Sequence, residues 1–243
     1  MDDSIFLSRM RDIARLCDKY RTAKFSRFLD SREQVVLEHN RISGTLFGGY
    51  EDAERRILGV FPKWQEPELS LFPIDLLKIT VKGEQCPSHR QYLGTILSLG
   101  IERDRIGDIL TEDNGAYVFV SSDISQFIKD NITKIGKCRA SVEYTDLGSV
   151  DLPGKEFENI QCVCASLRLD AIVAGLTGIS RNEAKKIILS GKVFVNHFDA
   201  QKIDFPVKEG DLLSVRGFGR AKIEEIGAKT RSDRIHITFK KYI

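Results

Sequence analysis

The sequence predicts an α+β protein with more than one domain. The chain has 243 residues, enough for two domains of ordinary size, and 42% hydrophobic and 30% charged residues are typical of a folded globular protein. Helical and strand patterns alternate through the middle of the chain. Residues 161–243 hold 15 Lys and Arg against 9 Asp and Glu, whereas the preceding residues hold 22 against 26. A basic end on an acidic chain favours a polyanionic partner.

Residues 1–72 are predicted to form a mainly helical segment. A first helix is indicated by apolar residues at helical spacing, namely Ile5, Ile13, Leu16 and Tyr20. A second helix is predicted from Ser31, a residue type that favours the N-cap position, to about Asn40. Glycines after Asn40 and prolines from Pro62 onward then interrupt the pattern.

Residues 73–160 show a regular alternation of strands and helices. The predicted elements are strands at 74–81, 105–110, 116–120 and 138–147, with helices at 88–100 and 122–136. Their order, β-α-β-β-α-β, is that of ferredoxin-like domains. RNA-recognition domains share this topology with many enzymes and ligand sensors, so the topology alone does not define a function.

Two aromatic residues on the third of these strands allow two interpretations. Tyr117 and Phe119 lie on one strand face, in a loose match to the pattern whose rings stack on bases in RNA-recognition domains. Alternating aromatic residues more often pack in the core, here under the two helices. The sequence favours packing of both rings in the core.

A change in composition precedes the basic end of the chain. Residues 148–161 contain two glycines, a proline and acidic residues, which is typical of a linker. The sequence therefore predicts a helical segment at 1–72, a ferredoxin-like domain at 73–160 and a basic domain at 161–243.

The stretch SRNEAKKIILSGKVFVN predicts a short basic helix followed by a strand. Ser180 and Glu183 have the spacing of a capping box, so the helix is expected to begin at Ser180. Its buried stripe is expected to be Ala184, Ile187 and Ile188. Arg181 and Lys185 then lie together beside that stripe, and Lys186 points away from it. Cations near a helix N-terminus suit phosphate binding, although solvated cations produce the same pattern.

The segment RGFGR is predicted to form a basic turn. Phe218 lies there between glycines, with Arg216 and Arg220 on either side. The ring is placed to stack on an unpaired base while the arginines meet phosphate. The alternative is a hairpin tip whose ring folds back on the sheet, and the sequence does not decide between the two.

Many positions of the C-terminal part resemble the RNA-binding module of the S-four family, named after the fourth protein of the small ribosomal subunit. The matching positions are Arg168-Leu169-Asp170, Ser180-Arg181, Ala184, Gly191, Val193, Val195-Asn196 and the turn Lys208-Glu209-Gly210-Asp211. The resemblance implies two helices and a small curled sheet that bind structured RNA, with phosphate contacts from Arg168, Arg181, Lys185 and Lys192. The whole predicted RNA-binding set is Arg168, Ser180, Arg181, Lys185, Lys186, Lys192, Asn196, Arg216, Phe218 and Arg220.

Nearly the whole chain also resembles the bacterial YlmH family. The stretches that carry this resemblance are Phe28-Leu29-Asp30, Arg32-Glu33-Gln34, FPIDLLKI, HRQYLGTILSLGIERDRIGDIL and RGFGR. The resemblance implies a cytoplasmic protein that contacts large-subunit rRNA and tRNA on the ribosome and takes part in the rescue of stalled nascent chains. By gene neighbourhood, it also implies a possible division-related protein partner, and a cell-division adaptor is the alternative function.

An RNA-modifying enzyme is a less favoured alternative. Asp170 resembles the catalytic aspartate of pseudouridine synthases, but it lies inside the binding module, and no glycine-rich cofactor turn of a methyltransferase is present. Asp75 and Asp108 are a conceivable carboxylate pair that nothing in the sequence brings together. His89 is expected near a helix start as a surface or capping group. The sequence predicts no catalysis and no cofactor.

The cysteines and the apolar runs bear on three further features, namely disulfides, a zinc site and a membrane span. Five cysteines make a poor disulfide framework, and Cys162 and Cys164 lack the second ligand pair of a zinc site, so the two thiols are expected to share one strand face. No apolar run has the length of a membrane span, and the N-terminus does not resemble a signal peptide. A cytoplasmic location is therefore expected.

Overall fold

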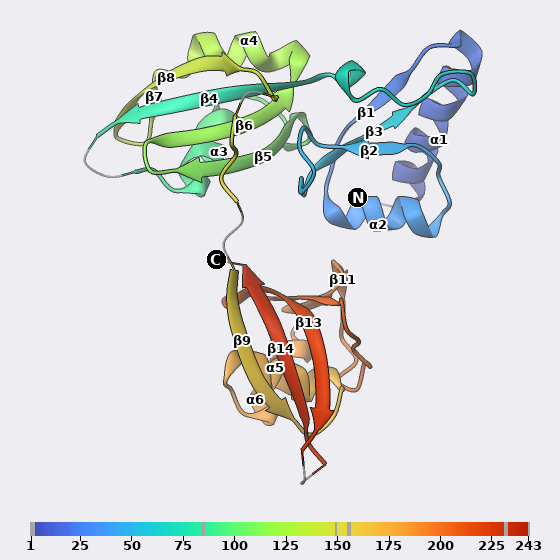
Figure 1. Cartoon of the computed structure of the whole chain (residues 1–243), viewed down its shortest axis with the longest axis vertical. Helices are drawn as coiled ribbons and strands as arrows, with labels where there is room; N and C mark the ends of the chain where they lie inside the picture. Colours follow the sequence, from blue (N-terminus) through green and yellow to red (C-terminus); the bar gives the residue numbers. More distant parts are fainter. Residues whose placement is uncertain (1–2, 84–85, 149, 155–156, 231–232, 243) are drawn as a thin grey trace. The chain divides into compact units, whose positions relative to one another are not determined.

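The computed structural model describes residues 3–83, 86–148, 150–154, 157–230 and 233–242 (Figure 1). The chain divides into two compact units, at 1–153 and 154–243. Part of the predicted linker, at residues 149 and 155–156, lies outside the described residues. Each unit is described by itself.

The N-terminal part of the first unit contains a sheet as well as helices. Its elements are α1 (Asp3–Tyr20), β1 (Lys24–Leu29), α2 (Ser31–His39), β2 (Thr45–Phe47), β3 (Arg56–Val60) and a short 3₁₀ turn, η1 (Leu69–Leu71). The two predicted helices are confirmed. The three-stranded sheet, in the order β1-β3-β2, was not predicted, because glycines and charged residues break the alternation of its short strands.

The N-cap of α2 is Asp30, one residue before the predicted Ser31. The Asp30 carboxylate accepts a hydrogen bond from the Glu33 backbone N–H at 2.8 Å, and the Glu33 carboxylate accepts one from the Asp30 N–H, also at 2.8 Å. We expect Asp30→Ala to lower the free energy of unfolding by about 1 kcal/mol, since a capping side chain is worth about that much. Ser31→Ala is the control, with little effect expected, and urea titration measures both. Equal losses for the two variants would contradict the assignment.

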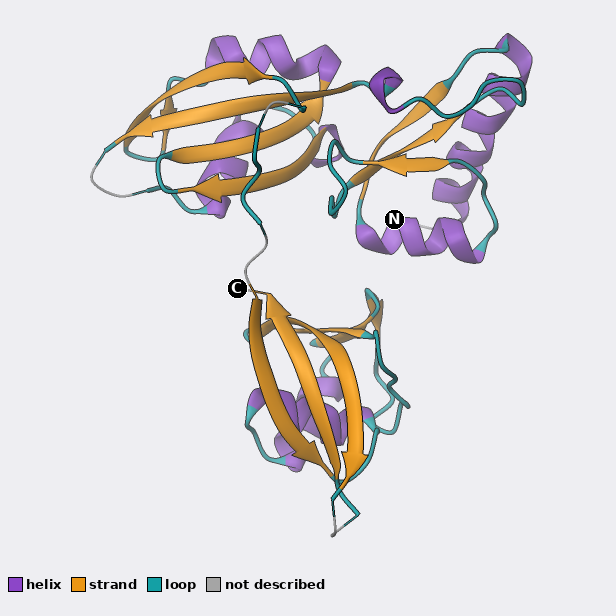
Figure 2. Ribbon diagram, in the orientation of Figure 1, coloured by secondary structure: helices purple, strands orange, loops and turns teal. Residues whose placement is uncertain are grey.

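The rest of the first unit is the predicted ferredoxin-like domain. Its elements are β4 (Ile74–Lys82), α3 (His89–Ser98), η2 (Arg103–Arg105), β5 (Ile106–Glu112), β6 (Gly115–Ser121), α4 (Ser122–Asn131), β7 (Lys134–Ile135) and β8 (Cys138–Thr145). The sheet is antiparallel in the order β5-β6-β4-β8-β7, and both helices lie on one face of it (Figure 2). The helix predicted to reach residue 136 ends at Asn131 instead, and the short strand β7 follows.

The other face of this sheet is covered by the N-terminal part. Tyr117 and Phe119 belong to a buried cluster that includes Phe28 and Ile57, and they are 5% and 0% exposed. The Phe119 ring also stacks on Tyr50, with 5.0 Å between ring centroids. The two rings are therefore core residues, as the favoured interpretation had it. They pack under the N-terminal part, however, and not under the helices.

The second unit is a curled sheet with two helices on one face. Its elements are β9 (Phe157–Cys164), α5 (Leu169–Thr177), α6 (Arg181–Leu189), β10 (Val193–Val195), β11 (Phe198–Asp199), β12 (Leu212–Val215), β13 (Gly219–Lys229) and β14 (Ile235–Tyr242). The sheet order is β11-β10-β12-β13-β14-β9. The two helices, the curled sheet and the β13–β14 hairpin agree with the predicted fold. The pairing of β9 with β14 shows that this sheet already begins at Phe157.

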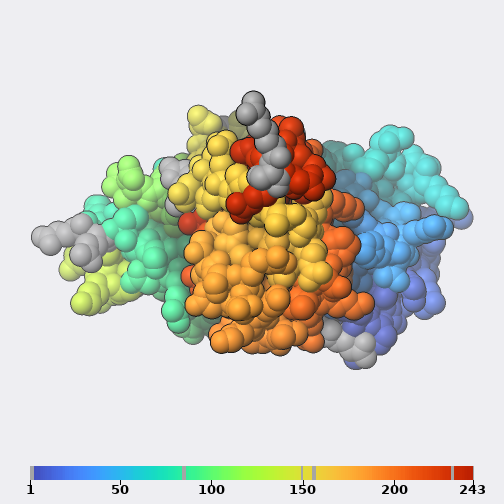
Figure 3. All heavy atoms as spheres, turned by 90° about the horizontal axis from the view of Figure 1, so that it is seen from below, coloured from blue at the N-terminus to red at the C-terminus, as the bar shows by residue number. Residues whose placement is uncertain are grey.

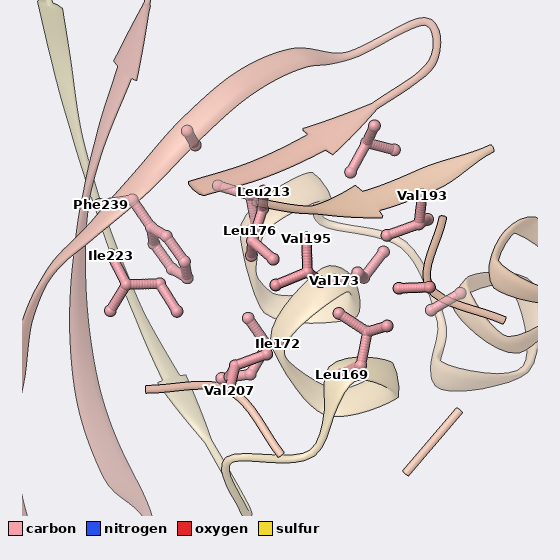
Figure 4. Packing of buried hydrophobic residues seen from close by; sticks show 14 of the residues in the cluster. Leu169, Ile172, Val173, Leu176, Val193, Val195, Val207, Leu213, Ile223 and Phe239 are labelled. Atoms are coloured by element: carbon pink, nitrogen blue, oxygen red, sulfur yellow. The ribbon is translucent and has the colours of Figure 1, made fainter. Parts of the chain in front are cut away.

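The core of the second unit lies between α5 and the sheet. Figure 4 shows the side chains of α5 pointing toward those of the strands, and all the residues that it labels are buried. The labelled α5 residues are Leu169, Ile172, Val173 and Leu176, and those of the strands are Val193, Val195, Leu213, Ile223 and Phe239. This packing fixes α5, and through it α6, against a rigid support.

Candidate nucleic-acid interface

The turn between α5 and α6 places the N-terminus of α6 at the surface. Gly178 ends α5 in the left-handed conformation at φ 73°, and its N–H donates to the Ala174 carbonyl at 3.0 Å. Ser180 caps α6 in the predicted capping box, in which its hydroxyl accepts from the Glu183 N–H at 3.2 Å. The α5–α6 segment is the exposed yellow-orange surface in Figure 3.

The capping box changes how this helix end can attract phosphate. The Glu183 carboxylate accepts hydrogen bonds from the Ser180 N–H and hydroxyl at 2.9 and 2.7 Å, and these bonds lower the pKa of Glu183. A carboxylate therefore already lies at the positive end of the helix dipole. Any attraction for phosphate must come mainly from the basic side chains.

Two of the predicted phosphate-binding arginines are held by one buried carboxylate. Asp170, in the first turn of α5, is 0% exposed. Its Oδ1 accepts from Arg168 Nε at 3.2 Å, and its Oδ2 accepts from an Arg181 terminal nitrogen at 2.9 Å. Each arginine side chain remains almost half exposed, at 44% and 49%. The carboxylate thus orients two guanidinium groups that still present N–H donors to solvent.

The two arginines keep this buried carboxylate charged. Burial by itself raises the pKa of Asp170, but the hydrogen bonds and charges of Arg181 and Arg168 outweigh burial, so the pKa lies below its ordinary value. We call Arg168, Asp170 and Arg181 the arginine clamp. The clamp carries a net charge of about +1 and joins the start of α5 to the start of α6.

The clamp makes the stability of the second unit depend on pH. Because the pKa of Asp170 is lower in the folded chain than in the unfolded chain, the stabilisation is present above the unfolded value of about 4 and is lost as pH falls below it. We expect Asp170→Asn to be less stable than the unmodified chain at pH 7 and this difference to shrink toward pH 3. Urea unfolding of both chains measures it, since the other carboxylates contribute equally to each. A difference that stays constant with pH would contradict the expectation.

The lysines of α6 continue the basic surface beyond the clamp. Lys185 lies one helical turn after Arg181 on the same side and is half-buried, whereas Lys186 is exposed on the outer side, where its charge helps to lower the pKa of Glu183. Lys192 is exposed after the helix. Neither Lys185 nor Lys192 forms an ion pair with any described residue.

Backbone pairing brings Arg216 next to Lys192. The Arg216 N–H donates to the Lys192 carbonyl at 2.9 Å. The Arg216 guanidinium lies over the Phe194 ring, 5.8 Å from its centroid, which is a cation–π contact. Two predicted residues, far apart in sequence, therefore meet beyond the C-terminal end of α6.

The predicted contact residue Asn196 has a structural role in this fold. It adopts φ 49°, and its amide nitrogen donates to Asp211 Oδ1 at 2.8 Å while its amide oxygen accepts from the Leu212 N–H at 2.9 Å. Asp211 is buried and also accepts from the Lys208 N–H at 2.8 Å. Both ends of the Asn196 amide are occupied in tying β10 to β12.

The turn RGFGR divides between the two sides of the sheet. The Phe218 ring is half-buried against the core, and Lys241 Nζ lies 4.9 Å from its centroid. This arrangement fits a ring folded back on the sheet, and it leaves little of the ring for a base. Arg220 lies on the outer sheet face, away from the helices, with its guanidinium 4.9 Å from the centroid of the Tyr242 ring. Arg220 is therefore apart from the α6 cations.

The other candidate groups have structural partners of their own. Asp75 accepts hydrogen bonds from the Ser122 and Ser125 hydroxyls at 2.8 and 2.5 Å. Asp108 accepts from the Tyr50 hydroxyl at 2.8 Å and from two backbone N–H groups. The two carboxylates are thus engaged in separate networks. His89 is the first residue of α3, after the Ser88 cap.

The two thiols of β9 share a strand face and pack on α5. Cys162 Sγ and Cys164 Sγ are 3.5 Å apart, and a Cβ added at Gly175 would lie 2.8 and 2.7 Å from them. The glycine therefore makes room for the thiols against the helix. Among the described residues, no group of three or more His, Cys, Asp or Glu is arranged to hold a metal ion.

Comparisons with known proteins place the chain in a family. Residues 67–149 match the model of the putative RNA-binding domain in YlmH, and residues 167–213 match that of the S4 domain. The chain is 31% identical to the ribosome-associated protein quality control protein P2 of Bacillus subtilis, over 99% of this chain and 95% of that protein. The chain belongs to the YlmH family. The resemblance seen in the sequence is thereby confirmed.

A solved structure agrees with this assignment at the level of the fold. The cell division protein YlmH from Streptococcus pneumoniae matches with a TM-score of 0.53 and 20% identity, over 62% of this chain and 96% of that chain. Within the YlmH-family chain, the S4 match includes the clamp, Lys185 and Lys192, but it ends before the turn RGFGR. In the described part of the chain, no helix is long and apolar enough to cross a membrane.

Sequence reasoning missed three features of this site. The sequence indicates Asp170 only as a marker of the family and as a possible catalytic group, although a carboxylate next to basic residues is itself a signal for an ion pair. Phe194 and Tyr242 were not singled out, because their contacts with Arg216 and Arg220 depend on strand pairing between distant segments.

Proposed function

We propose that this YlmH-family chain binds structured RNA on the ribosome through the α5–α6 surface, without catalysing a reaction on it. The observation that carries the proposal is the arginine clamp, which presents two oriented guanidinium groups at the start of α6, with Lys185 one helical turn later and Lys192 after the end of the helix. Planar arginine groups held by a carboxylate suit phosphate oxygens, since less side-chain freedom is lost on binding.

The proposed RNA partners are large-subunit rRNA and tRNA, and the proposed role is the rescue of stalled nascent chains. The name of the relative from Bacillus subtilis, a ribosome-associated quality control protein, supports this choice. Contacts to phosphate position a protein and carry little sequence information. Recognition is therefore expected to depend on RNA shape.

Binding without catalysis is supported by the state of the acidic residues. Asp170 is fully buried beneath two arginines and has no surface with which to reach a nucleotide. Asp75 and Asp108 are each held by several hydrogen-bond donors in separate networks. A catalytic acid or base needs contact with the reacting group, which Asp170 cannot make.

A second candidate is a protein adaptor that acts in cell division. It is favoured by the exposed apolar side chains between β3 and β4, where Trp64 is 73%, Leu69 50% and Leu71 43% exposed. Exposed apolar groups gathered in one segment often mark a protein contact. This candidate places the contact in the first unit, so it does not require the α6 lysines.

The test is cross-linking in growing cells, followed by sequencing of the RNA attached to the chain. The variant is Lys185→Ala/Lys192→Ala, because removing Arg181 would leave the buried Asp170 with fewer partners and confuse binding with stability. The matched control, Lys63→Ala/Lys134→Ala, removes two exposed lysines from the first unit.

We expect rRNA and tRNA to be recovered with the unmodified chain and the control, and to be strongly reduced with the α6 variant. Recovery of no RNA above background would overturn the proposal. Loss of a protein partner on replacement of Trp64, with RNA recovery unaffected by Lys185 and Lys192, would favour the adaptor.

A further inference from the structure

Within the described part of the second unit, both helices lie on one face of the sheet, and the outer face carries neither of them (Figure 2). The inward-pointing residues of β13 and β14 are buried in the core beneath α5 and α6, namely Ala221, Ile223, Ile237 and Phe239. Because side chains alternate along a strand, the residues between them point to the outer face. These outward residues are neither uniformly polar nor apolar.

Strand register places aromatic and basic side chains of five strands in one row. Phe194 pairs with Ser214, and Ser214 pairs with Arg220. The pairing of Ala221 with Lys241 sets Arg220 opposite Tyr242, and Tyr242 pairs with Phe157. We call Phe194, Ser214, Arg220, Tyr242 and Phe157 the aromatic row.

The contacts within the aromatic row are those of a stacking surface. The Arg216 guanidinium lies over Phe194, and the Arg220 guanidinium lies 4.9 Å from the Tyr242 centroid. The Tyr242 and Phe157 centroids are 5.0 Å apart, and the rings meet edge to face at 65°. Phe157 is 44% exposed. The Phe194 and Tyr242 rings are half-buried by their neighbours, and the Phe157 ring is the exposed one of the three.

A second row next to the first contains an electrostatic conflict. Lys222 pairs directly with Lys240, and Lys240 pairs with Asn159. Like charges opposite one another destabilise a sheet. The Glu224 carboxylate accepts from Lys240 Nζ at 2.8 Å, and this hydrogen bond together with the charges of Lys240 and Lys222 lowers the pKa of Glu224. Two lysines share this one carboxylate, so the group keeps a net charge of about +1, which suits an anionic ligand.

We propose that this outer face binds a single-stranded segment of RNA. Bases would stack on the rings of Tyr242 and Phe157 and on the planes of Arg216 and Arg220, while Lys222 and Lys240 contact the phosphates. Aromatic rings on an open sheet face beside cations recognise about two or three unpaired bases in this way. The inference deepens the proposed function, on which it rests, by adding a second RNA surface on the side of the sheet opposite α6.

The experiment measures fluorescence anisotropy of a labelled single-stranded oligouridine with the full chain. Oligouridine forms no duplex, so the α6 surface meets no structured RNA. Phe157→Ser/Tyr242→Ser is expected to weaken binding at least tenfold, because stacking of one base on one ring is typically worth that much. Lys222→Gln/Lys240→Gln is expected to reduce the slope of log affinity against log salt by about 1.4, at roughly 0.7 for each lost phosphate contact.

Two controls separate this inference from a structural effect. Lys185→Gln/Lys186→Gln, which removes two cations of α6 on the other side of the sheet, should leave oligouridine binding unchanged. Lys222→Gln alone, which leaves the Lys240–Glu224 ion pair intact, should keep its melting temperature and still reduce the salt slope by about 0.7, so its weaker binding cannot be ascribed to unfolding.

The outcomes also separate this inference from the proposed function. Binding of a structured rRNA fragment without binding of oligouridine would overturn this inference alone. So would oligouridine binding that survives both outer-face variants, and the face would then be a solvated surface or a protein contact. A chain that binds neither RNA would overturn the proposed function as well.

Discussion

Replacing Lys185 and Lys192 with glutamine is expected to weaken binding of a structured rRNA fragment about 30-fold at 0.15 M salt. Each lost contact to duplex phosphate reduces the slope of log affinity against log salt by about 0.9, and two contacts remove about 1.8. The contribution of these phosphate contacts to affinity vanishes at roughly 1 M salt. A slope smaller by about 1.8 therefore corresponds to an affinity about 30-fold lower at 0.15 M salt. Neither lysine forms an ion pair with a described residue, so the fold should lose little stability.

The measurement is a set of filter-binding or anisotropy titrations between 0.05 and 0.5 M salt (roughly the range in which the slope is linear). Lys63→Gln/Lys134→Gln carries the same change in net charge on the first unit and should retain the full slope. An α6 variant with weaker binding but an unchanged slope would show that the two lysines act through shape and not through phosphate. Equal losses for both double variants would show that only the net charge matters.

The local patterns of the α6 region were predictable because short-range chemistry determines them. The capping box of Ser180 and Glu183, the buried stripe of α6 and the glycine that ends α5 all depend on residues within one or two helical turns. The ferredoxin-like domain was predictable for a related reason. Its elements are long and alternate regularly, and the β-α-β-β-α-β order restricts the sheet to few arrangements.

Features that depend on contacts between distant segments were not predictable in the same way. The sheet of β1, β2 and β3 was not predictable because its strands are short and glycines and charged residues break their alternation. Tyr117 and Phe119 were correctly assigned to the core, but their covering layer comes from Phe28 and Ile57. Periodicity shows that a strand face is buried, and it does not show which segment buries it.

In the candidate site, too, local features were predictable and contacts between distant segments were not. The charges of Arg168, Arg181 and Lys185 were visible in the sequence, and the pairing of Lys192 with Arg216 was not, because it is a backbone contact between segments that meet only in the fold. The sequence also grouped Arg220 with the α6 cations, although strand register sends its side chain to the outer face. A one-residue change of register reverses the face of every side chain in a strand.

Replacing Asp170 with alanine is expected to weaken RNA binding even though it removes a negative charge from a basic surface. If the α6 cations acted as independent charges, the loss of a carboxylate would strengthen binding. In the structure, however, Asp170 orients both Arg168 and Arg181. Without it, the two side chains gain rotamer freedom that binding must remove again, at about 1 kcal/mol for each immobilised side chain. This entropy alone would weaken binding roughly 30-fold, and removal of the negative charge offsets part of that loss. We therefore expect binding to weaken about tenfold.

The same variant should destabilise the second unit by about 3 kcal/mol, because it removes two hydrogen bonds between charged groups, each worth about 1.5 kcal/mol. Circular dichroism during urea titration measures this loss, and binding is compared where the chain remains folded. Asp204→Ala, which removes an exposed carboxylate from the same unit, should keep its stability and bind RNA as well or slightly better. Tighter binding by Asp170→Ala with unchanged stability would show that the arginines need no positioning. The clamp would then be an ordinary surface ion pair.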